Sequence, residues 1–391
     1  MIGRYAAFSI MTSLDTNLTS DSPELELAHP KPAECQAIWL LISVPWRDAL
    51  SLSQFLEESA YLLTVPLAKD GGMTLWILVL KNSIPDQRAI LASCETYRKQ
   101  ALVSEDGGGD VEDVVVHGIA SVFCDPKFRG KGYAKVMLEK LAGALRGWQL
   151  KEGERCVGSM LYSDIGPRYY ASLGWRPVEG NTHIEMPSRE SISDLEHIKS
   201  LHTEDLQELC EQDESLIRTR LEDPQNAAKE QFIIIPNLNH MLWHHTKEEF
   251  VASKILPGRN PLTKGILVGD EVGKRVWAIW THRFYSDPNT VPSGNVLYIL
   301  RLVIEDVAPD GVELQRMLKV VFQAAQDEAM KWNLDVVKLW DPEPRVKRMI
   351  RRMGIEYEIV ERVTDEIASL MWYDEGTGRP EWVANEKYAW C

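Results

Sequence analysis

The stretch FCDPKFRGKGYAKVMLEKL, residues 123–141, joins a predicted strand to a predicted helix. Residues 114–124 are mostly apolar, as in a buried strand, whereas apolar side chains recur at helical spacing over residues 134–148. The first turn of a helix leaves backbone N–H groups unpaired and carries the positive end of the helix dipole. Glycines just before that turn let a bulky anion approach the backbone, because no Cβ intervenes. The stretch therefore predicts a phosphate or pyrophosphate site. The loop that would hold it comprises Arg129, Gly130, Lys131, Gly132, Tyr133 and Ala134.

The loop matches neither of two common phosphate motifs. The chain contains no G-x-x-x-x-G-K-[ST] sequence and no G-x-G-x-x-G sequence, so a P-loop and a dinucleotide fingerprint are both excluded. Arg129 and Lys131 would add charge-assisted hydrogen bonds to a bound anion. The alternative is a plain strand-to-helix connection with exposed basic residues.

The composition restricts the class of protein. A length of 391 residues suits two domains. The formal net charge of −15 argues against a nucleic-acid-binding protein, because phosphate affinity needs a basic face. Six cysteines are scattered without a C-x-x-C pair, which is typical of reduced thiols inside cells. No stretch has the length and apolar character of a membrane span. We expect a cytoplasmic protein, although residues 1–14, which carry Arg4 and no acid, leave a mitochondrial transit peptide open.

Turn residues and apolar periodicity predict two domains built on one plan. Residues 1–28 are expected to form a flexible tail. Residues 29–189 predict the order helix, helix, three strands, helix, strand, short helix, strand. Residues 190–391 repeat the later part of that order: a strand, a long helix, a strand, a short helix that ends at glycine, and a strand. We therefore expect an α/β (α+β) fold of two tandem domains, each a mixed, mostly antiparallel sheet flanked by helices.

Two motifs resemble those of a known superfamily. The pattern Val122-x-x-x-Pro126-x-x-Arg129-x-x-Gly132-x-Ala134 resembles the acetyl-CoA signature of the GNAT N-acetyltransferases. The segment Tyr169–Trp175 resembles the tyrosine-to-glycine-aromatic end of their second motif, although Ser163 stands where that motif commonly has asparagine. Stretches such as HGIASVFCDPKFRGKGYA and LMWYDE make the chain most similar to the fungal lysine N6-acetyltransferase family, in which a degenerate GNAT-like region follows the GNAT domain.

The resemblance implies an acetyl-CoA-dependent N-acetyltransferase of a small amine, with the N6 amine of free L-lysine favoured and a place in lysine degradation. The pyrophosphate of acetyl-CoA would lie on residues 129–134. Main-chain N–H groups at Val122 and Phe123 would polarise the thioester carbonyl, and Tyr170 would give a proton to the departing thiolate. Tyr170 could instead be an aromatic residue that only packs within its helix.

The acceptor amine has to lose a proton before it attacks. A lysine amine has a pKa of about 10.4, so roughly one in 2,500 is neutral at pH 7. Glu95 and His117, on two predicted strands, are candidate bases. Either could be structural, and Glu95 could instead anchor the acceptor amine. The carboxylate of Cys391 is a further candidate, because some GNAT-like acyltransferases place their C-terminus in the active site; a merely packed chain end is the alternative.

The second half lacks the anion loop. Ala308-Pro309-Asp310-Gly311 stands at the equivalent position, and an acidic residue there would repel a pyrophosphate. We expect one acetyl-CoA site per chain, with the second half covering the acceptor pocket. We expect no metal ion, because adjacent His244 and His245 lack ligand spacing. We also expect a monomer or homodimer with no nucleic-acid or membrane partner. Two other functions stay open: a protein lysine or N-terminal acetyltransferase, and a catalytically silent GNAT that senses acyl-CoA.

Overall fold

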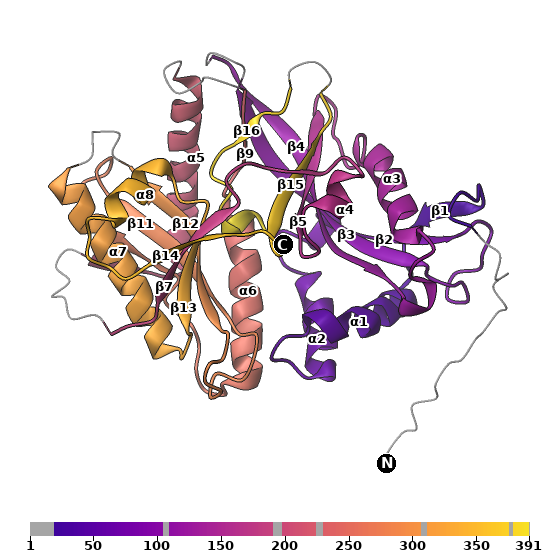
Figure 1. Ribbon diagram of the computed structural model, residues 1–391, viewed down its shortest axis with the longest axis horizontal. Coiled ribbons are helices and arrows are strands. Elements are labelled where there is room, and N and C mark those ends of the chain that lie inside the picture. Colours follow the sequence, from indigo (N-terminus) through magenta and orange to yellow (C-terminus); the bar gives the residue numbers. More distant parts are fainter. Residues whose placement is uncertain are drawn as a thin grey trace.

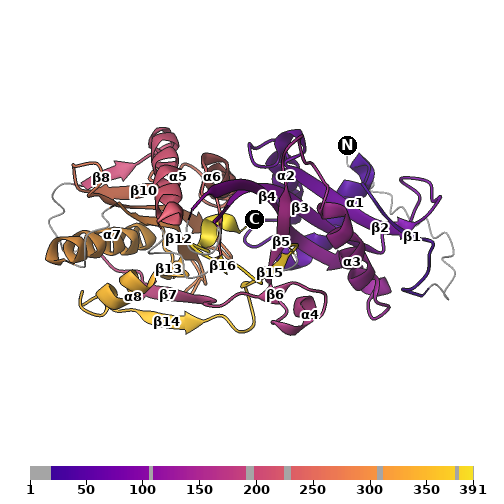
Figure 2. The ribbon, with the colours of Figure 1, turned by 90° about the horizontal axis from the view of Figure 1, so that it is seen from above.

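Two β-sheets flanked by helices lie side by side in the computed structural model of the chain (Figure 1). The structure describes residues 19–104, 109–190, 198–223, 230–305, 311–374 and 378–390. The predictions for the first 18 residues, for Ala308–Asp310 and for Cys391 lie outside this range. The last described residues run between the two sheets (Figures 1 and 2).

The first sheet follows the order β1-β2-β3-β4-β5-β15-β6, with β9 paired to β3 and β16 paired to β9. Neighbouring strands are antiparallel except β9 with β16 and β4 with β5, and α3 (Tyr133–Leu145) connects the latter two. Its strands are β1 (Leu25–Ala28), β2 (Met73–Leu80), β3 (Ala92–Ser104), β4 (Val111–Cys124), β5 (Cys156–Ser163), β6 (Arg176–Pro177), β9 (Gln231–Ile234), β15 (Ile367–Trp372) and β16 (Glu381–Trp382).

The second sheet follows the order β14-β7-β13-β12-β11-β10-β8. Its parallel pair is β12 with β13, which α7 (Val312–Lys331) connects. Each sheet thus contains one parallel pair joined by a helix, and the predicted fold class is confirmed. The strands of the second sheet are β7 (Thr182–Pro187), β8 (Ile198–Leu201), β10 (Gly265–Val268), β11 (Val276–Arg283), β12 (Val296–Ile304), β13 (Val336–Trp340) and β14 (Glu358–Glu361).

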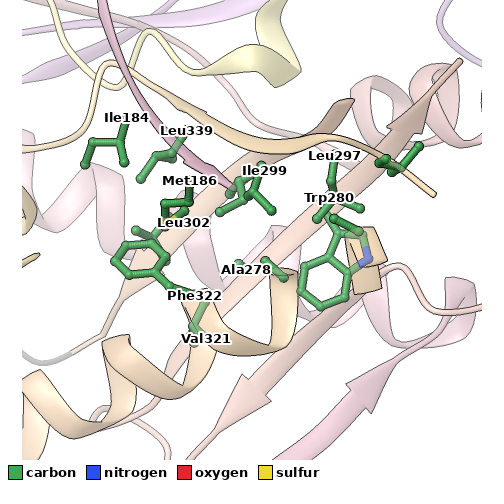
Figure 3. Packing of buried hydrophobic residues seen from close by; sticks show 14 of the residues in the cluster. Ile184, Met186, Ala278, Trp280, Leu297, Ile299, Leu302, Val321, Phe322 and Leu339 are labelled. Atoms are coloured by element: carbon green, nitrogen blue, oxygen red, sulfur yellow. The ribbon is translucent and has the colours of Figure 1, made fainter. Parts of the chain in front are cut away.

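The two sheets exchange strands. β7 follows α4 (Arg168–Ala171) of the first half but pairs with β13 and β14 of the second sheet. β15 comes from the second half but pairs with β5 and β6 of the first. Figure 3 shows Ile184 and Met186 of β7 packed among side chains of the second sheet. The last strand predicted in the first half is therefore two strands, β6 and β7, that lie in different sheets. Neither sheet is built from one side of the predicted boundary at residues 189–190, and that boundary remains a prediction.

Helices cover the outer faces of the sheets and fill the space between them (Figure 2). α3 packs on one face of the first sheet, and α1 (Pro32–Trp46) and α2 (Leu52–Leu62) lie on the other. α7 covers the second sheet, and α8 (Pro344–Ile350) follows β13. α5 (Leu206–Glu222) and α6 (Leu238–Ile255) lie between the sheets. Both sheets share a central apolar cluster there. Its members include Val116, Met160, Trp277, Leu300 and Tyr388.

Local sequence signals explain some of these elements. α2 begins with a capping box: Ser51 Oγ accepts a hydrogen bond from the Gln54 N–H, and Gln54 Oε1 accepts one from the Ser51 N–H. α1 runs to Trp46, although Pro45 lies in its last turn. None of the helices within the described ranges has the length and apolarity of a membrane-spanning segment.

Candidate active site

The strands β4 and β5 separate at one end of the first sheet. Their parallel pairing ends where Ile119 opposes Leu161. Beyond that point β4 continues beside β3 as far as Cys124, and β5 continues beside β15 as far as Ser163. We call residues 120–124 of β4 and 162–163 of β5 the β4–β5 fork. The predicted anion loop follows the β4 side of the fork directly.

A β-bulge kinks β4 within the fork. Ser121 and Val122 stand opposite a single β3 residue, Cys94, before regular pairing resumes at Phe123. Ser121 has a φ of 51°, which is unusual for a residue other than glycine. A bulge takes backbone groups out of the regular ladder and re-aims them. The bulge includes Val122 and directly precedes Phe123; the role of these two residues in polarising a thioester remains a prediction.

The anion loop leads into a helix start without a capping side chain. Gly130 and Gly132 have φ values of 77° and 82°, and Gly132 is the N-cap residue of α3. A Cβ at Gly132 would lie 3.0 Å from the Ser20 side chain. A residue with a side chain at this position would also have to adopt the left-handed backbone conformation that glycine adopts easily. No side-chain hydrogen bond from Gly132 can satisfy the first N–H groups of α3. These groups fit an anion as their partner.

The basic side chains of the loop lie at the surface. Arg129 Nε donates a hydrogen bond to the Cys124 carbonyl at 3.1 Å, and its guanidinium lies 5.3 Å from the centre of the Phe123 ring. Both contacts attach the loop to the end of β4. Lys131 is exposed, whereas Tyr133 is buried under the first turn of α3. The loop combines exposed positive charge with an uncapped helix start, which is the chemistry that phosphate groups require.

Tyr170 lies on the α3 side of the first sheet. It belongs to α4, is 8% exposed, and packs edge-on against Tyr169 with ring centroids 5.1 Å apart. Burial raises the pKa of Tyr170, and the neighbouring Tyr169 and Asp164 raise it further. The hydroxyl therefore keeps its proton at neutral pH, as a proton donor must.

Glu95 lies on the opposite face of the sheet, beside the bulge. Its Oε2 accepts hydrogen bonds from Ser121 Oγ at 3.0 Å and from the Tyr97 hydroxyl at 3.4 Å. Burial raises the pKa of Glu95, against the opposing effects of these hydrogen bonds and of the charge on Lys247. A buried carboxyl group with a raised pKa is suited to proton transfer near neutral pH.

His117 is not brought to the same place. It pairs with Ser159 in the part of β4 that is still hydrogen-bonded to β5, and the alternation along β4 puts it on the face opposite Glu95. Its ring is fully buried, with Nδ1 3.5 Å from the Cys156 sulfur. Burial lowers the pKa of His117 to about 4. Its role as a base remains a prediction, and its surroundings are those of a packed side chain.

A pocket lies between the two halves, on the Glu95 side of the first sheet. It takes residues from the α1–α2 connection, α6, the end of β11 and the end of the chain. Lys247 lines this pocket, and its charge also acts on Glu95. The charged and aromatic residues of its wall include Asp48, Lys247, Arg283, Tyr285, Lys387 and Trp390.

These pocket residues were missed by the sequence analysis. They come from four separate parts of the chain, and α6 itself was not predicted. The only available signal was the aromatic chain end. Trp390 stacks on His244 with ring centroids 6.3 Å apart, so the chain end does reach the pocket. The role predicted for the Cys391 carboxylate concerns a residue outside the described range.

The adjacent histidines of α6 point to different partners. His244 Nε2 lies 3.3 Å from the Tyr388 carbonyl, and His245 Nε2 lies 2.9 Å from the Trp280 carbonyl. Within the part of the chain that the structure describes, no group of three His, Cys, Asp or Glu side chains is placed to share a metal ion. The absence of a metal ion from the mechanism remains a prediction.

Comparison with known proteins identifies relatives over most of the chain. The uncharacterized protein YGR111W of Saccharomyces cerevisiae is 25% identical over 340 residues, which cover 80% of each chain. The lysine acetyltransferase of Yarrowia lipolytica is 20% identical over 398 residues, covering 88% of this chain and 94% of that one. A crystal structure of a conserved Enterococcus faecalis V583 protein, described as a probable N-acyltransferase, matches with a TM-score of 0.51 and 10% identity. It covers 88% of this chain and 71% of that chain and shares the fold.

The match to a family profile extends over more than half of the chain. Residues 183–391 match the family described as LYC1 GNAT-like C-terminal domain. The match begins within β7, the strand that the first half contributes to the second sheet. The chain therefore belongs to the family with a LYC1 GNAT-like C-terminal domain, and it is an acetyltransferase of the GNAT type.

Proposed function

We propose that this protein transfers the acetyl group of acetyl-CoA to the N6 amine of free L-lysine. The observation that carries the proposal is the position of the β4–β5 fork. On one side the fork is followed by a glycine loop and an uncapped helix start, and on the other it adjoins Glu95 and a charged pocket. A relative named lysine acetyltransferase, similar along 88% of the chain, supports lysine as the acceptor.

The anion loop is the proposed binding site of the acetyl-CoA pyrophosphate. The N–H groups at the start of α3 would receive the phosphate oxygens, and Arg129 and Lys131 would add charge. Gly130 and Gly132 keep side chains away from that backbone. When bound, acetyl-CoA supplies an acetyl thioester as the acyl donor. The backbone N–H groups of Val122, in the bulge, and of Phe123, directly after it, would hold the carbonyl oxygen of that group.

Proton transfer is assigned to residues on the two faces of the sheet. Glu95 would take the proton of the acceptor ammonium, with Ser121 holding the carboxylate in place. Tyr170, on the α3 face, would hold a proton for the sulfur leaving group. The acid and the base would thus act from opposite faces of the sheet. His117 takes no part in this scheme.

An acceptor screen tests the proposal. Purified protein is incubated with acetyl-CoA and free L-lysine, polyamines or a histone peptide, and the products are identified by mass spectrometry. We expect N6-acetyl-lysine from free lysine. Transfer to the peptide alone would favour a protein acetyltransferase. Tight acyl-CoA binding without any transfer would favour a sensor.

Matched variants test the residue roles in the same assay. Tyr170→Phe and Glu95→Gln are each expected to lower kcat by about 10²- to 10⁴-fold, the usual contribution of acid–base catalysis. Tyr169→Phe is the control for the first, because its ring packs on Tyr170. Glu34→Gln is the control for the second, because Glu34 is also buried but pairs with Arg88 away from the fork. Equal losses in variant and control would contradict the assignment.

A further inference from the structure

The pocket between the halves contains an ion pair in which not every polar atom has a hydrogen-bond partner among the described residues. Arg283, at the end of β11, forms an ion pair through its Nη2 atom with Asp48 of the α1–α2 connection. Arg283 Nε is buried and, among the described residues, has no hydrogen-bond partner. The Asp48 carboxylate can accept several hydrogen bonds and is 16% exposed. The pair thus offers donors and acceptors to a molecule in the pocket.

The guanidinium group of Arg283 is held in place by aromatic rings. Its central carbon lies 5.2 Å from the centre of the Tyr285 ring and 5.7 Å from that of Trp390. An arginine restrained by stacking keeps its planar fork of donors in a fixed orientation. Such a fork matches the two oxygens of a carboxylate, and a fixed fork loses little entropy on binding one.

The other charges of the pocket wall are already balanced by protein groups. Lys247 Nζ lies 2.9 Å from Glu58, and Lys387 Nζ lies 2.8 Å from Glu366. Glu248 is neutralised by Lys264 at 2.6 Å. Arg283 and Asp48 also pair with each other, but Arg283 is the charged residue of the pocket wall that keeps a buried polar atom, Nε, without a hydrogen-bond partner in the described part of the chain. One cation beside one anion matches a zwitterion better than it matches a simple anion.

Two connections link the pocket to the fork. Two residues before Asp48, Trp46 packs on Phe123 at the end of β4 with ring centroids 6.1 Å apart. Lys247 belongs to the pocket wall and acts electrostatically on Glu95. A head group bound at Asp48 and a reacting amine near Glu95 would be separated by a flexible stem, as in an amino acid with a terminal amine.

We propose that Arg283 and Asp48 select the acceptor by binding its α-carboxylate and α-ammonium groups, so that the enzyme accepts a free amino acid rather than a simple amine or an internal peptide residue. This inference rests on the proposed function. It adds the two residues that recognise the end of the acceptor away from the reacting amine. A lysine within a peptide has neither charged group, because both are consumed in amide bonds.

Substrate analogues test this recognition in the wild-type protein. 1,5-Diaminopentane lacks the carboxylate, and 6-aminohexanoate lacks the α-ammonium group, while both keep a terminal amine. A charge-assisted hydrogen bond contributes about 1.5–3 kcal/mol, so each analogue should have a kcat/KM about ten- to a hundredfold below that of lysine. This comparison needs no mutation and does not depend on whether a variant folds. Analogues as good as lysine would overturn the inference.

Two variants then assign each group to its residue. Arg283→Gln should lower kcat/KM for lysine and 6-aminohexanoate about ten- to a hundredfold but leave that for 1,5-diaminopentane unchanged. Asp48→Asn should affect lysine and 1,5-diaminopentane but not 6-aminohexanoate. The matched control is Arg218→Gln, because Arg218 forms its ion pairs on α5 and with Asp113, away from the pocket.

The outcomes separate this inference from the proposed function. Losses that are equal for all three substrates would refute recognition by Arg283 and Asp48 while lysine acetylation stands. A wild-type protein that acetylates peptides but not lysine would refute the proposed function, and the inference with it. Thermal unfolding of each variant identifies a loss that comes from misfolding.

Discussion

Separating the two halves of the chain should leave neither of them folded. A fragment of residues 1–189 lacks β15, whose Ile367 and Leu370 are 2% and 1% exposed in the intact protein. The same fragment keeps β7 without its sheet, so Ile184 and Met186, both 0% exposed, would face water. Burial of one such side chain stabilises by about 1.5–3 kcal/mol, so separation costs about 3–6 kcal/mol at β7 of fragment 1–189 and the same at β15 of fragment 190–391, about 6–12 kcal/mol together. This is comparable to the whole stability of a domain, about 5–15 kcal/mol.

Circular dichroism and urea unfolding of the fragments measure this effect. The fragments 1–189 and 190–391 should each lack a cooperative transition when produced alone, and co-expression should restore one. The control is the full chain with a protease site between residues 189 and 190, cut after folding, which should remain associated. The reasoning is refuted if fragment 1–189 alone unfolds cooperatively with a free energy close to that of the full chain. That result would also support the predicted domain boundary.

Three further substitutions have outcomes that follow from local structure. Gly132→Ala should weaken CoA binding in calorimetry and destabilise by about 1–2 kcal/mol, because φ is 82° and the new Cβ would lie 3.0 Å from Ser20. Burial lowers the pKa of His117 to about 4, so the folded protein binds fewer protons than the unfolded chain between pH 6.5 and 4. Stability in urea should therefore fall as the pH drops through that range, by about 3 kcal/mol for this group, and His117→Gln should flatten the slope. Lys264→Met should cost about 3–5 kcal/mol in unfolding free energy, because it leaves Glu248 buried without its cation, and adding Glu248→Gln should recover part of the loss.

Local sequence signals were sufficient for elements whose structure is decided locally. The α2 capping box depends on two residues three positions apart, and the start of α3 depends on a glycine pair and an apolar period. Both are visible in a short window. The strand at Val114–Cys124 was also recognisable, because a long apolar run rich in β-branched residues favours a buried strand. The anion loop is a feature of the same local kind.

The strand exchange could not be predicted, because nothing in β7 or β15 specifies which half supplies the partner. Both strands are short and apolar and would suit either sheet. α6 was missed for a related reason. Its buried face contains the polar residues His240, His244 and Glu248, whose partners come from distant parts of the chain. Lys99 of β3 lies beside His240, the Tyr388 carbonyl beside His244, and Lys264 and His282 beside Glu248. A hydrophobic period cannot reveal such a face.

The same long-range contacts fix the proposed acceptor pocket. His282 donates from its backbone N–H and its Nδ1 to Glu248 Oε2, at 2.6 and 2.9 Å, and its Nε2 lies 3.2 Å from Glu328. Arg283 is the next residue along β11, so its backbone is held by a buried polar network whose Glu248 and His282 also line the pocket. A binding group anchored in this way needs little reorganisation when a ligand arrives, which favours selectivity. The strand exchange also connects the two sheets, because β7 pairs in the second sheet and β15 in the first. We therefore expect the fork and the pocket to keep their positions relative to each other.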